Sequence, residues 1–214
     1  MFRFLKPAKH VDPLPAEKVD DTYKKLRLQV FLGIFIGYAG YYLLRKNFSL
    51  AMPSLIEDGF SKGELGIALS AISIAYGFSK FVMGTVSDRS NARVFLTLGL
   101  MLTAIVNLLL GFVPFFTSSI TIMFIMLFLN GWFQGMGWPP SGRVLVHWFS
   151  VSERGSKTSI WNVAHNVGGG LMAPIATWGI SMTALYNFGY LKGFEGVFIY
   201  PGLLAIVIAI IAYG

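Results

Sequence analysis

Cysteine is absent from this 214-residue chain, and charged residues make up only 13% of it. The absence of cysteine excludes a disulfide framework, a thiolate metal site and a cysteine nucleophile. The shortage of charge accompanies 55% hydrophobic residues and a mean hydropathy of +0.64. The apolar residues form long runs, which is typical of membrane proteins and leaves little room for a soluble catalytic domain. We therefore do not expect an enzyme.

Carboxylates are missing from the interior of these apolar runs. All ten Asp and Glu residues lie in the N-terminal tail, in loops or at segment ends, namely Asp12, Glu17, Asp20, Asp21, Glu57, Asp58, Glu64, Asp88, Glu153 and Glu195. Proton-driven transporters of sugars or drugs commonly need a carboxylate inside the membrane. Its absence favours an anionic ligand.

Six apolar segments of membrane-spanning length can be marked, at 28–44, 63–86, 94–113, 118–142, 158–182 and 196–214. A helix needs about 20 apolar residues to cross a bilayer, and an open strand cannot satisfy its backbone in lipid. The sequence therefore predicts an all-α integral membrane unit over 28–214. The polar residues 1–27 lack the apolar core of a signal peptide and are expected to form a tail. The last apolar run has no following loop, so we expect a longer protein.

Basic residues are distributed unevenly between the two sides of the membrane. Twelve of the 17 Lys and Arg residues lie in the tail and in the loops near 87–93 and 143–157, whereas Arg45, Lys46, Lys62 and Lys192 lie on the opposite side. An excess of Lys and Arg marks the cytoplasmic side. The net charge of +7 is thus interpreted as a topology signal, with the lipid bilayer and not nucleic acid as the partner.

Two cations and several tyrosines stand out in the apolar segments. Lys80 lies inside segment 63–86, where a cation costs roughly 2.5–3.5 kcal/mol on insertion scales, although a Lys can also snorkel to the interface. Tyr38, Tyr42 and Arg45 are spaced i, i+4, i+7 and share one helix face. Tyr76 and Lys80 repeat the pairing of a tyrosine with a cation at i, i+4. These residues are candidates for binding an oxyanion, and phosphate suits Arg and Lys donors well.

Other polar residues allow two interpretations. His165 is either a packing residue or a group whose charge changes near neutral pH in an anion site. Tyr41 is expected to be an interfacial belt residue. A membrane phosphatase is disfavoured because His10, His147 and His165 are scattered. Glycines at 131, 135, 137 and 168–170 offer surfaces on which helices can approach closely.

Two local patterns carry a family resemblance. Residues 84–93 read GTVSDRSNAR and resemble the cytoplasmic loop motif of the major facilitator superfamily, with Gly84, Asp88, Arg89 and Arg93 in register. Residues 154–169 begin with RG and continue to WNVAHNVGG, which looks like the signature of the organophosphate:phosphate antiporters within that superfamily. The stretches YYLLRKNFSLAMP at 41–53 and GWFQGMGWPP at 131–140 extend the likeness through the chain, which looks most similar to members that carry glycerol-3-phosphate.

The resemblance implies the six-helix N-terminal half of a major facilitator fold, built as 3+3 inverted repeats, with the C-terminal half missing. It also implies exchange of glycerol-3-phosphate for inorganic phosphate across the bacterial inner membrane, with no cofactor and no metal. Hexose phosphate, phosphoglycerate or a sensor role remain alternatives. The implied substrate-binding residues are Arg45, Lys80, His165, Tyr38, Tyr42, Tyr76, Lys46, Trp138 and Trp161.

Overall fold

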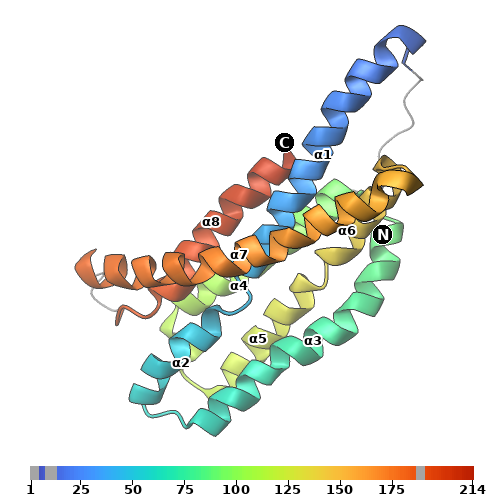
Figure 1. The fold of residues 1–214 in the computed structure, drawn as a ribbon. Helices are drawn as coiled ribbons and strands as arrows, with labels where there is room; N and C mark the ends of the chain where they lie inside the picture. The colour runs from blue at the N-terminus through green and yellow to red at the C-terminus, as the bar shows by residue number, and fades with distance from the viewer. Residues whose placement is uncertain (1–4, 8–13, 187–190) are drawn as a thin grey trace.

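A computed structural model describes residues 5–7, 14–186 and 191–214, and all regular structure in these ranges is helical (Figure 1). Two features organise it: long helices run side by side, and two of them are interrupted near their middle. The elements are α1 (Ala16–Leu43), α2 (Asn47–Glu57), α3 (Lys62–Asp88), α4 (Ala92–Phe112), the 3-10 helix η2 (Pro114–Thr117), α5 (Ile120–Gln134), α6 (Trp138–Trp148), α7 (Val151–Tyr186) and α8 (Gly196–Tyr213).

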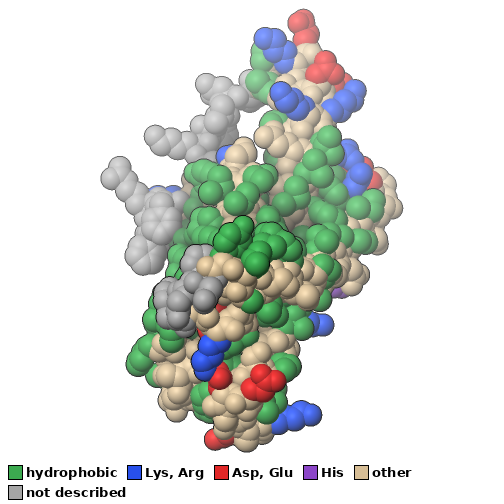
Figure 2. Space-filling model, turned by 90° about the vertical axis from the view of Figure 1, so that its left-hand side faces the viewer, with side chains coloured by type: hydrophobic (Ala, Val, Ile, Leu, Met, Phe, Trp, Pro, Cys, Tyr) green, Lys and Arg blue, Asp and Glu red, His purple; other side chains and the backbone are tan. Residues whose placement is uncertain are grey.

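Five stretches are long and apolar enough to cross a membrane: Glu17–Glu57, Lys62–Asp88, Ala92–Phe112, Ile120–Trp148 and Gly196–Tyr213. The predicted segment 158–182 lies in α7, which is 36 residues long but too polar to meet the same measure of hydropathy. Asn162, His165 and Asn166 interrupt its apolar sequence. Figure 2 shows charged side chains toward both ends of the molecule and a mainly hydrophobic band between them, as expected for a multi-pass membrane protein.

The helices pack in pairs that suggest an internal repeat. Helix α1 packs mainly on α7, α5 packs mainly on α3, and α4 packs on α8. Helices α1 with α2, α3 and α4 form the first three crossings, and α5 with α6, α7 and α8 form the last three. If the two sets correspond in order, the α1–α7 pair corresponds to the α5–α3 pair, and the α4–α8 pair corresponds to itself. The predicted 3+3 arrangement therefore accounts for the observed pairing.

Both interrupted crossings break at corresponding places in this repeat. The first breaks at 44–46, between α1 and α2, and the fourth breaks at 135–137, between α5 and α6. The first predicted segment, 28–44, was therefore too short, because the crossing continues through α2 after a polar interruption. Arg45 and Lys46 consequently lie inside a crossing and not at its end, which leaves Lys62 and Lys192 as the basic residues of the opposite side.

Close helix approaches occur at particular glycines. A Cβ added at Gly131 would meet the backbone of Ile72, and one at Gly168 would meet the backbone of Ala39. Gly131 thus brings α5 against α3, and Gly168 brings α7 against α1, which confirms the close approach predicted at these two glycines. Gly169 and Gly170 have open space instead, since a Cβ there would meet no atom within 4 Å.

Tyr41 is not an interfacial residue, contrary to the expectation from sequence. Its side chain is 2% exposed, and its hydroxyl donates a hydrogen bond of 2.7 Å to the carbonyl of Leu96 in α4. The hydroxyl finds a backbone acceptor inside the bundle because Gly99, one turn along α4, leaves room for it. Tyr41 therefore links α1 to α4.

Helix α1 starts at Ala16, well before the apolar segment that begins at 28. No Gly or Pro occurs between residues 16 and 27, so the helix continues past the bundle, as Figure 1 shows. The Tyr23 hydroxyl donates to the carbonyl of Trp148 at 2.7 Å, and Arg27 forms an ion pair with Glu153. These contacts attach the projecting part of α1 to the junction of α6 and α7.

Candidate anion-binding site

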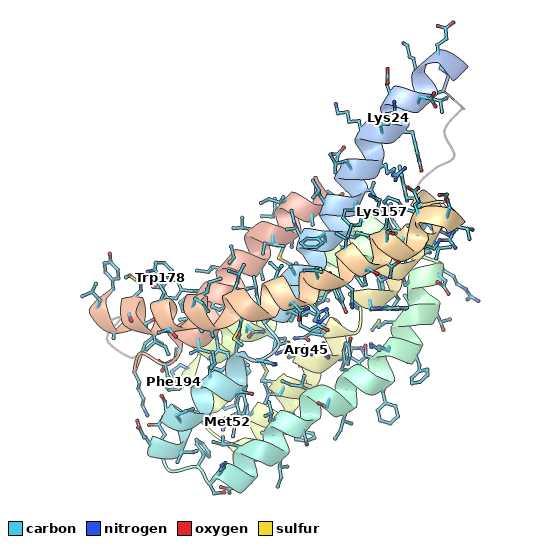
Figure 3. The ribbon with its side chains drawn as sticks, in the orientation of Figure 1. Lys24, Arg45, Met52, Lys157, Trp178 and Phe194 are labelled. Atoms are coloured by element: carbon cyan, nitrogen blue, oxygen red, sulfur yellow. The ribbon has the colours of Figure 1, made fainter. Side chains whose placement is uncertain are left out.

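Arg45 occupies the break between α1 and α2, near the middle of the bundle, and Figure 3 shows it between α7 and α3. Its guanidinium carbon lies 4.0 Å from the ring centroid of Tyr76 and 5.0 Å from that of Tyr42. A cation over an aromatic face is attracted by the ring quadrupole. Two rings from different helices therefore hold this half-buried cation.

Lys80 shares one of these rings. Its ammonium nitrogen lies 4.4 Å from the centroid of Tyr76, one helical turn earlier in α3. The i, i+4 spacing brings the two side chains together, as the sequence predicted. Tyr76 thus contacts Arg45 and Lys80 at once, and Lys80 is exposed while Arg45 is half-buried.

A second row of rings extends from Tyr42 toward α7. Tyr42 lies 5.4 Å from Tyr38 and 5.4 Å from His165, measured between ring centroids. Tyr38 lies 4.5 Å from Trp161. Since α1 and α7 pack closely at Gly168, the face of α1 that carries the tyrosines meets the face of α7 that carries His165. The structure therefore joins Arg45, Lys80 and His165 through aromatic side chains.

Trp161 and Trp138 have different surroundings. Trp161 is 2% exposed, and its indole N–H donates to the carbonyl of Ile34 at 3.3 Å, so this donor is already used. Trp138 is the first residue of α6, directly after the second break, and is largely exposed. Lys46 is exposed and makes no hydrogen bond or ring contact with the other candidate residues in the described ranges. Lys46 therefore stands apart from the cluster.

A cavity of about 1210 Å³ lies beside these residues, between α3, α6 and α7. Of the candidate residues, Lys80, Trp138 and Trp161 line it. Gly77 and Gly84 in α3 and Gly142 in α6 also line it, and their lack of side chains widens it. The lining reaches from the aromatic cluster to Asp88 at the end of α3.

The loop motif occupies the far end of this cavity. Gly84 and Asp88 line the cavity, and Arg89 follows the last residue of α3. Arg93 donates to the carbonyls of Tyr213 and Gly214 and lies over the Tyr213 ring at 4.8 Å, which ties the start of α4 to the end of α8. In the described residues, Asp88 and Arg89 form no ion pair.

Sequence reasoning missed two arginines near this end. Arg143 in α6 donates to the carbonyls of Ser87 and Ser90, and therefore braces the loop between α3 and α4. Arg154 donates to the carbonyl of Val146 at 3.0 Å and so caps the last turn of α6. Basic residues near helix C-termini often make such bonds, but only the fold identifies the helix that each one serves.

The arrangement suits an anion better than any other ligand. Two cations and a histidine surround aromatic rings with hydroxyl groups, and the described residues contain no group of three His, Cys, Asp or Glu side chains that could hold a metal ion. Arg can bind two oxygens of a phosphate at once, and Lys adds a point charge. Tyrosine hydroxyls can donate to further oxygens.

Comparison with known proteins agrees with this chemistry. Residues 34–214 match the family model of the Major Facilitator Superfamily. The chain is 61% identical over 209 residues to the glycerol-3-phosphate transporter of Bacillus subtilis, covering 98% of this chain and 45% of that protein. The glycerol-3-phosphate transporter of Haemophilus influenzae is 52% identical, with 100% and 45% covered. The membrane sensor protein UhpC of Escherichia coli is 39% identical, with 92% and 43% covered.

Among solved structures, a bacterial homologue of the human lysosomal transporter Spinster, inward-facing and unoccupied, matches with a TM-score of 0.74. It is 16% identical, and the match covers 87% of this chain and 42% of that one, so it supports the fold alone. The chain spans less than half the length of the curated relatives that it matches. With the family model covering most of the sequence, the chain belongs to the Major Facilitator Superfamily of membrane transporters.

Proposed function

We propose that this chain is the N-terminal half of a transporter that takes up glycerol-3-phosphate in exchange for inorganic phosphate. The observation that carries the proposal is the cluster in which Arg45 and Lys80 share the ring of Tyr76, with His165 one ring away on Tyr42. No carboxylate lies inside the crossings to favour a cation or a proton-coupled neutral sugar. The two most similar curated relatives described above are named for glycerol-3-phosphate.

In the proposed mechanism, the guanidinium of Arg45 binds two oxygens of the phosphate group, and Lys80 adds a second positive charge. Tyr38, Tyr42 and Tyr76 offer hydroxyl donors, and His165 lies beside the ring of Tyr42 as a further polar group of the site. The chain supplies one wall of the site, and the second six-helix half supplies the other. Rocking of the two halves around the site then exposes it alternately to each side.

The proposed orientation follows from the basic residues. Helix α1 before residue 28, the α3–α4 loop and the α6–α7 junction lie at one end of the bundle in Figure 1, and most Lys and Arg residues are there. We assign this end, with the tail 1–27, to the cytoplasm of a bacterial inner membrane. Asp88 and Arg89 then lie on the cytoplasmic surface, where they are suited to hold helix ends of the two halves together.

The direct test is uptake of labelled glycerol-3-phosphate into sealed proteoliposomes that contain the full-length protein, with and without phosphate trapped inside. Uptake that requires internal phosphate supports exchange. If a hexose phosphate or phosphoglycerate exchanges instead, the substrate assignment is wrong although the antiport mechanism stands. If organophosphates bind without crossing the bilayer, the protein is a sensor, which is a reasonable alternative because the UhpC sensor is 39% identical.

Arg45→Lys tests the assignment of the central cation. The variant keeps the positive charge but loses the planar fork that binds two oxygens, so we expect exchange to fall at least tenfold. Lys46→Arg is the matched control, because Lys46 is exposed and apart from the cluster. Near-normal exchange by Arg45→Lys would exclude a two-oxygen contact by this residue.

A further inference from the structure

Helix α4 is hydrogen-bonded to both sides of the break that carries Arg45, although no residue of α4 lines the cavity. The hydroxyl of Tyr41, four residues before Arg45, donates to the Leu96 carbonyl at 2.7 Å. The amide of Asn47, two residues after Arg45, donates to Asn107 Oδ1 at 3.1 Å. Both hydrogen bonds end on α4, one on each side of the break.

The Asn47–Asn107 bond is fully buried. The two side chains are 1% and 0% exposed, and Asn107 Nδ2 in turn donates to the carbonyl of Thr103, one turn earlier in α4. This second bond fixes the rotation of the Asn107 amide, so its oxygen faces α2. Asn47 Oδ1 is buried without a hydrogen-bond partner in the described residues, which leaves the bond to Asn107 as the polar connection of this side chain.

Apolar contacts on either side support the same attachment. Leu44, directly before Arg45, is 0% exposed and belongs to one hydrophobic cluster, while Phe48 is 1% exposed and belongs to another. Arg45 itself is half-buried between these anchors and turns toward the rings of Tyr42 and Tyr76. An interrupted helix loses regular hydrogen bonds at the interruption, so its geometry depends on such outside contacts.

We infer that Asn107 and Asn47 are positioning residues that fix Arg45 in its binding geometry, with Tyr41 as the second attachment. The inference rests on the proposed role of Arg45 in binding phosphate. A bidentate contact tolerates little displacement, since the two donors must meet two oxygens together. Losing the attachment to α4 therefore lowers affinity without removing any group that touches the ligand.

Replacement of one or both amides separates positioning from stability. Asn107→Leu leaves the Asn47 amide buried and unpaired, so it lowers the melting temperature and weakens phosphate binding by about tenfold. The double variant Asn47→Leu/Asn107→Leu removes both polar groups, which can be nearly neutral for stability. We expect its melting temperature to recover while its Kd stays raised, because the break is no longer bonded to α4.

The matched control is Thr103→Val. Thr103 is also buried in α4, but its hydroxyl donates to Gly99 of the same helix and has no bond to the break. We expect this variant to bind phosphate as the unmodified protein does. If the Kd of the double variant recovers together with its melting temperature, the asparagines have a purely structural role and the inference is wrong.

A measurement without ligand keeps this inference separate from the proposed function. Phenylglyoxal modifies arginine, and peptide mass spectrometry of the full-length protein measures the modified fraction of Arg45. The double variant is expected to react several-fold faster, because its guanidinium is less well held against the two rings. An unchanged rate refutes the positioning role. If the unmodified protein binds neither phosphate nor glycerol-3-phosphate, the proposed function fails, and the labelling rate alone decides the role of Asn107.

Discussion

Removing the ring of Tyr76 is the sharpest perturbation of the site, because one side chain contacts both cations. The guanidinium of Arg45 is 4.0 Å from its centroid and the ammonium of Lys80 is 4.4 Å away. Tyr76→Leu deletes both cation–π contacts and the hydroxyl, whereas Tyr76→Phe deletes the hydroxyl alone. The pair of variants therefore separates the contribution of the ring from that of the hydrogen-bond donor.

The size of the effect follows from the exposure of the two cations. Cation–π contacts contribute about 0.5–1 kcal/mol at exposed sites and more when desolvated. Lys80 is exposed and Arg45 is half-buried, so together the two contacts are worth roughly 1–2 kcal/mol. Without the ring, both cations must be ordered when the ligand binds, so up to this whole free energy is lost from binding and Tyr76→Leu raises Kd by up to about 5- to 30-fold. Tyr76→Phe should lose less, since it keeps both contacts.

The assay is equilibrium binding of labelled phosphate and glycerol-3-phosphate to the full-length protein, with exchange in proteoliposomes measured in parallel. Phe78→Leu serves as a control, because Phe78 is an exposed aromatic residue on the same helix without a contact to either cation. An unchanged or tighter Kd for Tyr76→Leu would refute the reasoning. The ring would then compete with the anion for the two cations instead of positioning them to bind it.

Two further predictions concern packing and pH. Gly168→Ala should lower stability by about 1–3 kcal/mol, because its Cβ meets the backbone of α1, whereas Gly170→Ala should be neutral or slightly stabilising in thermal unfolding. Desolvation raises the pKa of Glu153, but the Ser150 backbone N–H and Arg27 outweigh it, so the pKa lies below its usual value. The contacts of Glu153 with Ser150 and Arg27 therefore contribute to stability above about pH 4.3, and this contribution is lost as the pH falls through the lowered pKa of Glu153. Glu153→Gln should flatten this pH dependence of stability in thermal melts at about pH 3–6.

Much of the fold can be predicted from the sequence because its signals are local. Apolar runs mark α3, α4 and α8 within a few residues, and i, i+4 spacing correctly pairs Tyr76 with Lys80. The error over the first crossing is also instructive. Arg45, Lys46 and Asn47 end the apolar run, although the helix already resumes at Asn47. A polar interruption inside a crossing and a true end of a crossing look alike when only local hydropathy is considered.

The remaining features depend on contacts between residues far apart in the chain. The burial of Tyr41 depends on the space at Gly99, and the role of Asn107 depends on Asn47, which lies 60 residues earlier. No periodicity in either segment indicates these partners. The proline pair at 139–140 after three closely spaced glycines could have revealed the second break, since transporter sites often lie where crossings of both repeats are interrupted.

The electrostatics of the cluster give a physical reason for expecting exchange in the proposed transporter. Arg45 and Lys80 have no carboxylate partner among the described residues, and the ring of Tyr76 between them compensates their charges only in part. Burying such a pair without an anion is costly, because desolvated charges need a counter-charge. Closure of the two halves over an empty site therefore has a high barrier, whereas a bound phosphate group neutralises the cations and lowers it. Reorientation then requires an anion in each direction, which is the condition for obligatory exchange.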